Sequence, residues 1–457
     1  MVFCAKFASA QDTDKQTLDR RYQSAVADYD AGRYSEAAQQ LESLLSFAPR
    51  SYELHELLGL VYSSLSEDAK AEDHFKLAVR LKPDSAAART NLGAALLHSG
   101  KAALAGEQFQ KALQLEPQSY DANHDLGELY IQSGKLAEAR PLLDIAHRIR
   151  PDSYDNAYDL AMADFRLDQL MEARDVATSI AKKQNTGELQ NLLGQIDEKD
   201  GRFVEAANEF EAAAHMDPSE DNLFDWGSEM LLHRTYEPAI AIFQQGTVRY
   251  SHSPRLFIGL GLALYSRGKY VEAVQALIAA VDLNPSDSRS YLFLSQAYDS
   301  SPKQAEDVIQ RFRRYAELRP QDARARYYYA MSLWKGKRSE DASADLTIVR
   351  SLLQKSIALD GSIPEVHLQL GDLYAGEHHY DKSIPEYVRA LELNPNLSDA
   401  HYRLGTDYVH VGKKDEAQKE FAVYQKLRAA HLAEVDKEGD EVQQFVYSEK
   451  DGTSSKF

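Results

Sequence analysis

The chain has 457 residues, 44% of them hydrophobic, and its 71 acidic and 52 basic residues give a formal net charge of −19 at pH 7. This acidity argues against sequence-independent binding to nucleic acid or to an anionic membrane surface, because both depend on clustered lysine and arginine. The single cysteine, Cys4, excludes an intrachain disulfide and a zinc site built on cysteines. No apolar run is long enough to predict a transmembrane helix.

Residues 1–16 are expected to form a leader or a disordered N-terminus. The first ten residues are mostly apolar and end in Ala8-Ser9-Ala10, which is typical of a signal-peptidase site. This predicts the remnant of a signal peptide that starts upstream of Met1, a mature chain that begins at Gln11, and a periplasmic or secreted protein. The alternative is a cytoplasmic protein with an alanine-rich N-terminus. N-terminal sequencing of natively produced protein separates the two.

Residues 17–432 carry a repeating pattern. Pro83, Pro117 and Pro151 recur every 34 residues, and a fixed period of this size predicts a solenoid of helix pairs. Between two such prolines, two apolar runs at helical spacing are separated by Gly100, a residue suited to the left-handed conformation that ends a helix. Each unit is therefore expected to be a helical hairpin.

About twelve such units follow one another, and position numbers below are counted from the first residue of each. They span residues 18–51, 52–85, 86–119, 120–153, 154–186, 187–219, 220–253, 254–287, 288–322, 323–363, 364–397 and 398–431. The tenth is longer by about seven residues, inserted around 335–342, and such insertions usually form loops on one face.

The same small and large residues return at the same positions of the units. The third unit has Leu92, Gly93, Leu96, Gly100, Ala105, Phe109, Ala112 and Pro117. A glycine inside a helix costs roughly 1 kcal/mol against alanine, so its return predicts close packing of the paired helices. This pattern closely resembles the tetratricopeptide repeat (TPR) family. The resemblance implies an all-α, right-handed α-solenoid over residues 17–432 with a C-terminal capping helix, whose end and a disordered tail occupy 433–457.

Motifs for catalysis are not found. The sequence has no phosphate-binding loop, no dinucleotide fingerprint, no nucleophile elbow and no zinc-protease helix. His378 and His379 fall in an expected turn between helices, where polar residues are ordinary. We therefore expect no catalytic residue, no cofactor and no metal site.

In proteins that resemble this one, peptides lie along the first helix of each hairpin, at positions two, five, nine and twelve. Two groups of residues on these helices are candidate sites. The first, called the arginine group below, comprises Arg255, Arg289, Arg324, Tyr265, Tyr327, Met331 and Trp334. The second, called the acidic group, comprises Asp121, His124, Glu128, Asp155, Tyr158 and Phe165. For the arginine group, we expect an acidic or C-terminal peptide segment with an apolar side chain anchored near Trp334.

The expected function is that of a non-catalytic scaffold that binds a protein or peptide in its concave groove, with no nucleic acid partner. Two alternatives stay open. One is a TPR component of a bacterial envelope-assembly or secretion machine, and the other is the TPR partner of a glycosyltransferase or protease system. The oligomeric state does not follow from the sequence.

Overall fold

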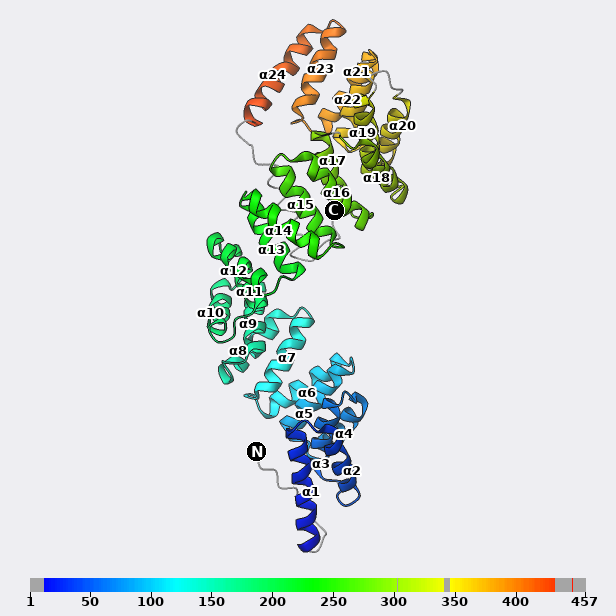
Figure 1. The fold of residues 1–457 in the computed structure, drawn as a ribbon. Coiled ribbons are helices and arrows are strands. Elements are labelled where there is room, and N and C mark those ends of the chain that lie inside the picture. The colour runs from blue at the N-terminus through cyan, green and yellow to red at the C-terminus, as the bar shows by residue number, and fades with distance from the viewer. Residues whose placement is uncertain (1–11, 302, 341–345, 432–445, 447–457) are drawn as a thin grey trace. The chain divides into compact units, whose positions relative to one another are not determined.

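The computed structural model describes residues 12–301, 303–340, 346–431 and 446, and all of its secondary structure in these ranges is helical. The chain forms two compact units, residues 1–209 and 210–457, each of which is described by itself. Unit 1 consists of successive helical hairpins (Figure 1). Its helices are α1 (Asp12–Asp30), α2 (Tyr34–Leu45), α3 (Tyr52–Ser64), α4 (Asp68–Leu81), α5 (Ala86–His98), α6 (Ala102–Leu115), α7 (Tyr120–Gln132), α8 (Leu136–Ile149), α9 (Tyr154–Arg166), α10 (Leu170–Ala181) and α11 (Gly187–Lys199).

The boundary between the units falls within α12 (Phe203–Met216). Unit 2 repeats the hairpin arrangement (Figure 1). Its helices are α13 (Glu220–Leu232), α14 (Tyr236–Arg249), α15 (Pro254–Ser266), α16 (Tyr270–Leu283), α17 (Ser288–Ser300), α18 (Ala305–Leu318), α19 (Ala323–Glu340), α20 (Thr347–Leu359), α21 (Pro364–Gly376), α22 (Tyr380–Leu393), α23 (Ser398–His410) and α24 (Lys414–His431). The all-α architecture of helical hairpins expected from the sequence is confirmed.

One local expectation was wrong. The insertion of the tenth repeat was expected to form a loop around residues 335–342, but α19 continues through Glu340. The segment Lys335-Gly336-Lys337-Arg338 has no proline, the residue that most strongly ends a helix, and its one glycine is tolerated within α19. Residues 12–16 of the expected leader or disordered N-terminus are helical and begin α1. The rest of that segment, and the expected disordered tail apart from Val446, lie outside the described residues.

Serine and glycine set the ends of the hairpin helices. The Ser51, Ser85 and Ser119 hydroxyls accept hydrogen bonds from backbone N–H groups of α3, α5 and α7, at 3.3, 3.2 and 3.4 Å. At the other end of α5, Gly100 has φ = +71°, a left-handed conformation that costs a residue without a Cβ very little.

The glycines inside the first helices bring the two helices of a hairpin into close contact. A Cβ atom placed on Gly93 would lie 2.4 Å from the ring of Phe109, and one on Gly261 would lie 2.5 Å from Leu277. Both distances are too short for real Cβ contacts, so the packing of α5 on α6 and of α15 on α16 requires glycine. The close approach expected from the sequence is therefore present.

Neighbouring hairpins are joined by packing and by polar contacts. Within each unit the first helix of a hairpin touches the first helix of the next, as in the series α5, α7, α9 and the series α13, α15, α17. The Tyr120 hydroxyl lies 2.7 Å from the hydroxyl of Ser153, the residue that caps the next first helix. The first helices of each unit thus present a continuous face, called the inner face here, which carries positions two, five, nine and twelve.

Buried aspartates link consecutive hairpins in unit 1. Asp164, which is 1% exposed, accepts a hydrogen bond of 2.8 Å from Arg140 of the preceding hairpin. Asp197 is fully buried and accepts bonds from Arg174, at 2.7 and 3.1 Å. Both aspartates stand at position eleven, which holds leucine in the third repeat, and both arginines stand at position 21. Each of these two hairpin junctions thus contains an ion pair between a buried aspartate and a partly exposed arginine.

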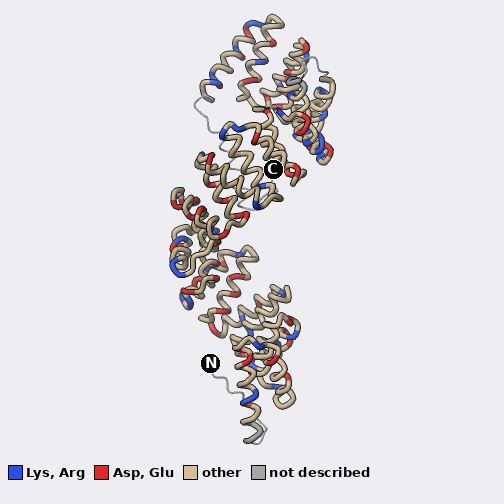
Figure 2. The backbone as a smooth tube through the Cα atoms, viewed as in Figure 1, with Lys and Arg blue, Asp and Glu red and all other residues tan. Residues whose placement is uncertain are grey.

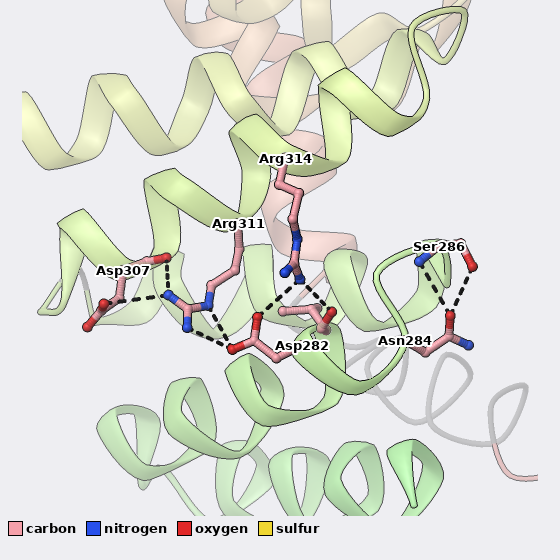
Figure 3. A network of polar contacts seen from close by, with 7 residues as sticks. Asp282, Asn284, Ser286, Asp307, Arg311 and Arg314 are labelled. Carbon is pink, nitrogen blue, oxygen red and sulfur yellow. Dashed lines mark hydrogen bonds and ion pairs between the residues drawn. The ribbon is translucent and has the colours of Figure 1, made fainter. Parts of the chain in front are cut away.

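In unit 2 the second helices are also linked by arginine and aspartate. Figure 3 shows Arg311 and Arg314 of α18 converging on Asp282 of α16. The shortest bonds are 2.7 Å from Arg311 and 3.0 Å from Arg314. Because these side chains are partly exposed, solvent screening limits what the pairs add to stability. These contacts join α18 to α16.

Candidate functional site

The two candidate groups lie on the inner faces of different units. The acidic group belongs to α7 and α9 of unit 1, and the arginine group belongs to α15, α17 and α19 of unit 2. Both groups occupy first helices, as the repeat positions require. The structure therefore allows each group to be assessed from its own contacts.

Two arginines of the arginine group are engaged within the chain. Arg255 donates hydrogen bonds to Glu220, at 2.7 Å, and to Asp221, and its guanidinium stacks 5.1 Å from the Phe224 ring centroid. Arg289 donates to both oxygens of Asp287, the residue that caps its own helix, at 3.1 Å each. These contacts use part of the hydrogen-bonding capacity of the two guanidinium groups, so a carboxylate ligand would have to compete with the chain's own carboxylates.

Arg324 differs from the other two arginines. Its side chain is exposed and, among the described residues, forms no ion pair. Burial raises the pKa of Tyr328, and Arg324 nearby opposes that rise. The three arginines thus occupy equivalent positions, but only Arg324 has an exposed side chain. Hydrogen bonds from Ser362 lower the pKa of Asp360 and the charge of Arg324 adds to this lowering, so a carboxylate lies near Arg324 as well.

The apolar members of the arginine group lie mostly in the core. Trp334 is 2% exposed and Met331 8% exposed, and both pack in a cluster with residues of α20 and α21. Tyr265 is half-buried against Tyr270, with ring centroids 5.4 Å apart. Tyr327 is also half-buried, and burial raises its pKa, as does the nearby Asp299. A ligand side chain could reach Trp334 only by displacing these neighbours.

The acidic group is more open. Asp121 and Asp155 are exposed, whereas the remaining four members are half-buried. Asp121 is paired with Arg150 at 3.2 Å. His124 stacks on Tyr120 with ring centroids 5.7 Å apart. Figure 2 shows the acidic residues along α7 and α9.

Aromatic side chains line the same helices. Tyr158 stacks on Tyr154 at 6.2 Å, and Lys199 lies 5.3 Å from the ring centroid of Phe165. Burial raises the pKa of Tyr158, and the carboxylate of Glu188 adds to the rise. The acidic group therefore combines carboxylates with partly exposed rings.

Two aspartates that sequence analysis did not select lie among these residues. Burial raises the pKa of Asp125 to about 6; His124 opposes this rise, and the carboxylates of Asp121 and Glu128 add to it. Burial likewise raises the pKa of Asp159 to about 6, with the same opposition from His124. Among the described residues, neither aspartate forms an ion pair.

A sequence signal for these two aspartates exists. Asp125 and Asp159 stand at position six of the fourth and fifth repeats, where the third repeat has Asn91. Asn91 itself donates a hydrogen bond of 2.5 Å to Glu56. Position six therefore extends the inner face in unit 1 beyond positions two, five, nine and twelve.

Within the described ranges, no group of three or more histidine, cysteine, aspartate or glutamate side chains is arranged to hold a metal ion. His378 has φ = +63° in its turn and contacts the hydroxyl of Tyr380 at 3.0 Å. No helix in those same ranges combines the length and the apolar character needed to cross a membrane.

Comparison with solved structures finds repeat proteins of low identity. A chain of the Naa15/Naa10 complex bound to HypK-THB is 17% identical with a TM-score of 0.34, covering 89% of this chain and 68% of that chain. The structure of pilF of Pseudomonas aeruginosa is 18% identical with a TM-score of 0.42, and the match covers 46% of this chain and 95% of that chain. YrrB, described as a TPR protein with an unusual peptide-binding site, is 17% identical with a TM-score of 0.36, and the match covers 42% of this chain and 99% of that chain. A comparison with curated proteins found no match.

Family models give a direct assignment. Models described as tetratricopeptide repeat match residues 22–86, 69–120, 96–146, 233–288, 258–316, 292–347 and 364–397. These segments cover more than half of the chain and fall on the hairpins described above. The chain belongs to the tetratricopeptide repeat family.

Proposed function

We propose that this protein is a non-catalytic scaffold, and that the acidic group of unit 1 binds a basic, extended segment of a partner protein. The observation that carries the proposal is the state of Asp125 and Asp159. Both are half-buried carboxylates on the inner face, and the described residues offer neither of them a lysine or arginine partner. Buried carboxylates elsewhere in the same unit, Asp164 and Asp197, have arginine partners.

A lysine or arginine from a partner would complete this arrangement. A cation close to a carboxylate favours its charged form, so binding would lower the pKa of Asp125 and Asp159 from about 6. Below pH 6 the two groups hold protons, which a cationic ligand must first displace. Affinity for a basic segment is therefore expected to rise as the pH rises through 6 and to fall on acidification.

The aromatic rings of the acidic group would supply the rest of the contact. Tyr158 and Phe165 are only half-buried, so they can cover the apolar parts of a ligand's lysine or arginine side chains. Tyrosine is also a residue type enriched at binding hot spots. A segment that alternates basic and apolar side chains would match both features.

The first prediction concerns a basic model peptide. A labelled peptide with four lysines and two tyrosines spaced by alanine is expected to bind the full chain at pH 7.5 and about tenfold more weakly at pH 5. The double variant Asp125→Asn, Asp159→Asn is expected to weaken binding at pH 7.5 by about tenfold and to remove most of the pH dependence. Fluorescence anisotropy measures both effects.

A matched variant controls for net charge. Asp73 and Asp175 are exposed and lie on second helices, so Asp73→Asn with Asp175→Asn makes the same change in net charge away from the inner face. This control is expected to bind the peptide as the unchanged chain does. Equal weakening by both double variants would show that the peptide responds only to overall charge, and the proposed site would be wrong.

The arginine group is the second proposed site, and its exposed Arg324 is the observation that favours it. There an acidic segment would replace Asp287 at Arg289 and approach the Trp334 cluster. The matched peptide with glutamate in place of lysine tests this site. If it binds the full chain, and Arg289→Ala or Trp334→Ala weakens it while the helical circular dichroism is unchanged, the acidic ligand is supported.

A place in a bacterial envelope-assembly or secretion machine, or beside a glycosyltransferase or protease, stays open within this proposal. Because the same fold binds many different partners, the proposed binding of basic or acidic segments does not distinguish among these processes. Cross-linking through the acidic group followed by mass spectrometry would identify the partner.

A further inference from the structure

One residue of the C-terminal segment is packed in the core of unit 2. Val446 is 0% exposed and belongs to a hydrophobic cluster built by α13 to α19. This cluster includes Phe224 and Leu231 of α13 as well as Ile258 and Leu262 of α15. Val446 thus packs with α13 to α19, although it follows the end of α24 at His431 by fifteen positions.

The cluster residues on α13 and α15 belong to the inner face. Phe224 and Leu231 stand at positions five and twelve of the seventh repeat, and Ile258 and Leu262 at positions five and nine of the eighth. Their exposed fractions are 1, 3, 1 and 3% respectively. In a hairpin array these positions point to the ligand-binding side. Arg255 covers part of the Phe224 ring, and the burial of Leu231, Ile258 and Leu262 beside Val446 points to a further covering group.

Unit 1 shows what the same positions look like without such a cover. Tyr158, Met162 and Phe165 occupy positions five, nine and twelve of α9, and all three are half-buried. At the corresponding positions of α13, Phe224, Ser228 and Leu231 are 1, 0 and 3% exposed. The two inner faces are built from the same repeat positions, and at positions five and twelve both carry large apolar or aromatic side chains. The greater burial of Phe224 and Leu231 is consistent with an occupant on unit 2.

We propose that the chain's own C-terminal segment around Val446 is an intramolecular ligand of unit 2, which it binds across the inner face of α13 and α15. Val446 is the anchoring side chain of this segment. The surface that it covers is then a binding site for an apolar segment of the same kind, available to another protein only when the C-terminal segment is displaced.

This occupancy is independent of the proposed function of the acidic group, which lies in unit 1. It rests in part on the second proposed site, because Arg255 and Tyr265 of the arginine group lie on the covered helix α15. A partner that binds there would compete with the chain's own terminus. Partner binding at unit 2 would thus be weaker in the intact chain than in a chain whose terminus is released.

Thiol accessibility tests the proposal in the full chain. With Cys4 changed to serine, Ser228→Cys places the only thiol on the covered face, and Met162→Cys places it on the equivalent open position of unit 1. In the intact chain the Ser228→Cys thiol is expected to react slowly with a maleimide reagent. Adding Val446→Asp, which puts a charge in the apolar contact, should speed this reaction about tenfold and leave the Met162→Cys rate unchanged.

A peptide supplied in trans separates release of the segment from general unfolding. A synthetic peptide of residues 440–450 should restore slow labelling of Ser228→Cys in the Val446→Asp chain, whereas the same peptide with aspartate at Val446 should not. Circular dichroism checks that the variant stays helical. If it does not, Val446→Ala is used, with an expected increase of about threefold.

The outcomes decide the proposal in either direction. Faster labelling that the peptide reverses supports an intramolecular ligand. Unchanged labelling of Ser228→Cys in a folded variant would overturn it, since the face would then be buried by unit 2 alone. Faster labelling that the peptide cannot reverse would also overturn it, because Val446 would then act as an ordinary core residue.

Discussion

Replacing Gly93 by leucine is expected to destabilise the hairpin formed by α5 and α6 by about 3 kcal/mol, at the upper end of the range for overpacking a core. A Cβ at this position would lie 2.4 Å from the ring of Phe109, which is fully buried and has no free space to move into. Leucine adds three further carbon atoms beyond that Cβ. Hydrogen exchange of the α5 and α6 amides measures the effect without assuming one global unfolding step, because repeats couple locally.

The matched control is a helical glycine without such a neighbour. Gly376 lies at the end of α21, and a Cβ placed on it meets nothing within 4 Å. Gly376→Ala is therefore expected to leave stability unchanged or to raise it by a few tenths of a kcal/mol, through helix propensity. If Gly93→Leu leaves the exchange of α5 and α6 as it was, the close contact with Phe109 has no energetic role and the assigned repeat register is mistaken.

The second large effect is expected from Arg140→Met. This change leaves Asp164, which is 1% exposed, without the guanidinium 2.8 Å away. Removing one partner of a buried ion pair typically costs about 3–5 kcal/mol; because Arg140 is itself 34% exposed and screened by solvent, we expect about 2–3 kcal/mol. Urea unfolding, followed by exchange of the α8 and α9 amides, measures the loss at the junction of the fourth and fifth repeats.

The pH dependence identifies the cause of this loss. Burial raises the pKa of Asp164, and Arg140 opposes that rise, so removing Arg140 must raise the pKa further. A carboxyl group whose folded-state pKa is raised favours folding at low pH and opposes it as the pH rises through that pKa. The penalty of Arg140→Met is therefore expected to be full at neutral pH and to shrink on acidification, as Asp164 takes up a proton.

A double variant provides the control for this prediction. Leu96 occupies the position in the third repeat that Asp164 occupies in the fifth. Adding Asp164→Leu to Arg140→Met replaces the charge pair by apolar side chains and should recover most of the lost stability. A double variant as unstable as Arg140→Met alone would mean that shape, rather than an unpaired charge, accounts for the loss.

The sequence alone determined the hairpin, its period and its internal contacts. Gly93, Phe109 and Gly100 lie within one repeat, and their effects act over short distances along the chain. A glycine at the close contact and another at the helix end are therefore recognisable without coordinates. Each such pattern is weak evidence in a single repeat, but its recurrence at the same positions of successive repeats indicates the TPR family.

The state of the candidate side chains was decided only by the tertiary structure. Arg255 is engaged by Glu220 and Asp221, which belong to the preceding repeat, and the sequence does not show whether such side chains meet. Asp125 and Asp159 acquire raised pKa values through burial, which depends on the neighbouring hairpins. Sequence reasoning selected positions on the first helices but could not tell which of their charges are already paired.

The insertion in the tenth repeat and the burial of Val446 show the same division. Insertion length is visible in the sequence, but α19 absorbs residues up to Glu340 because helical hydrogen bonds continue unless something stops them. Val446 lies in a polar stretch with no repeat pattern, and its burial arises from contacts with helices more than a hundred residues away. Local residue patterns therefore determine the repeat, whereas the contacts between repeats and with the terminal segment depend on surfaces that exist only once the hairpins have stacked.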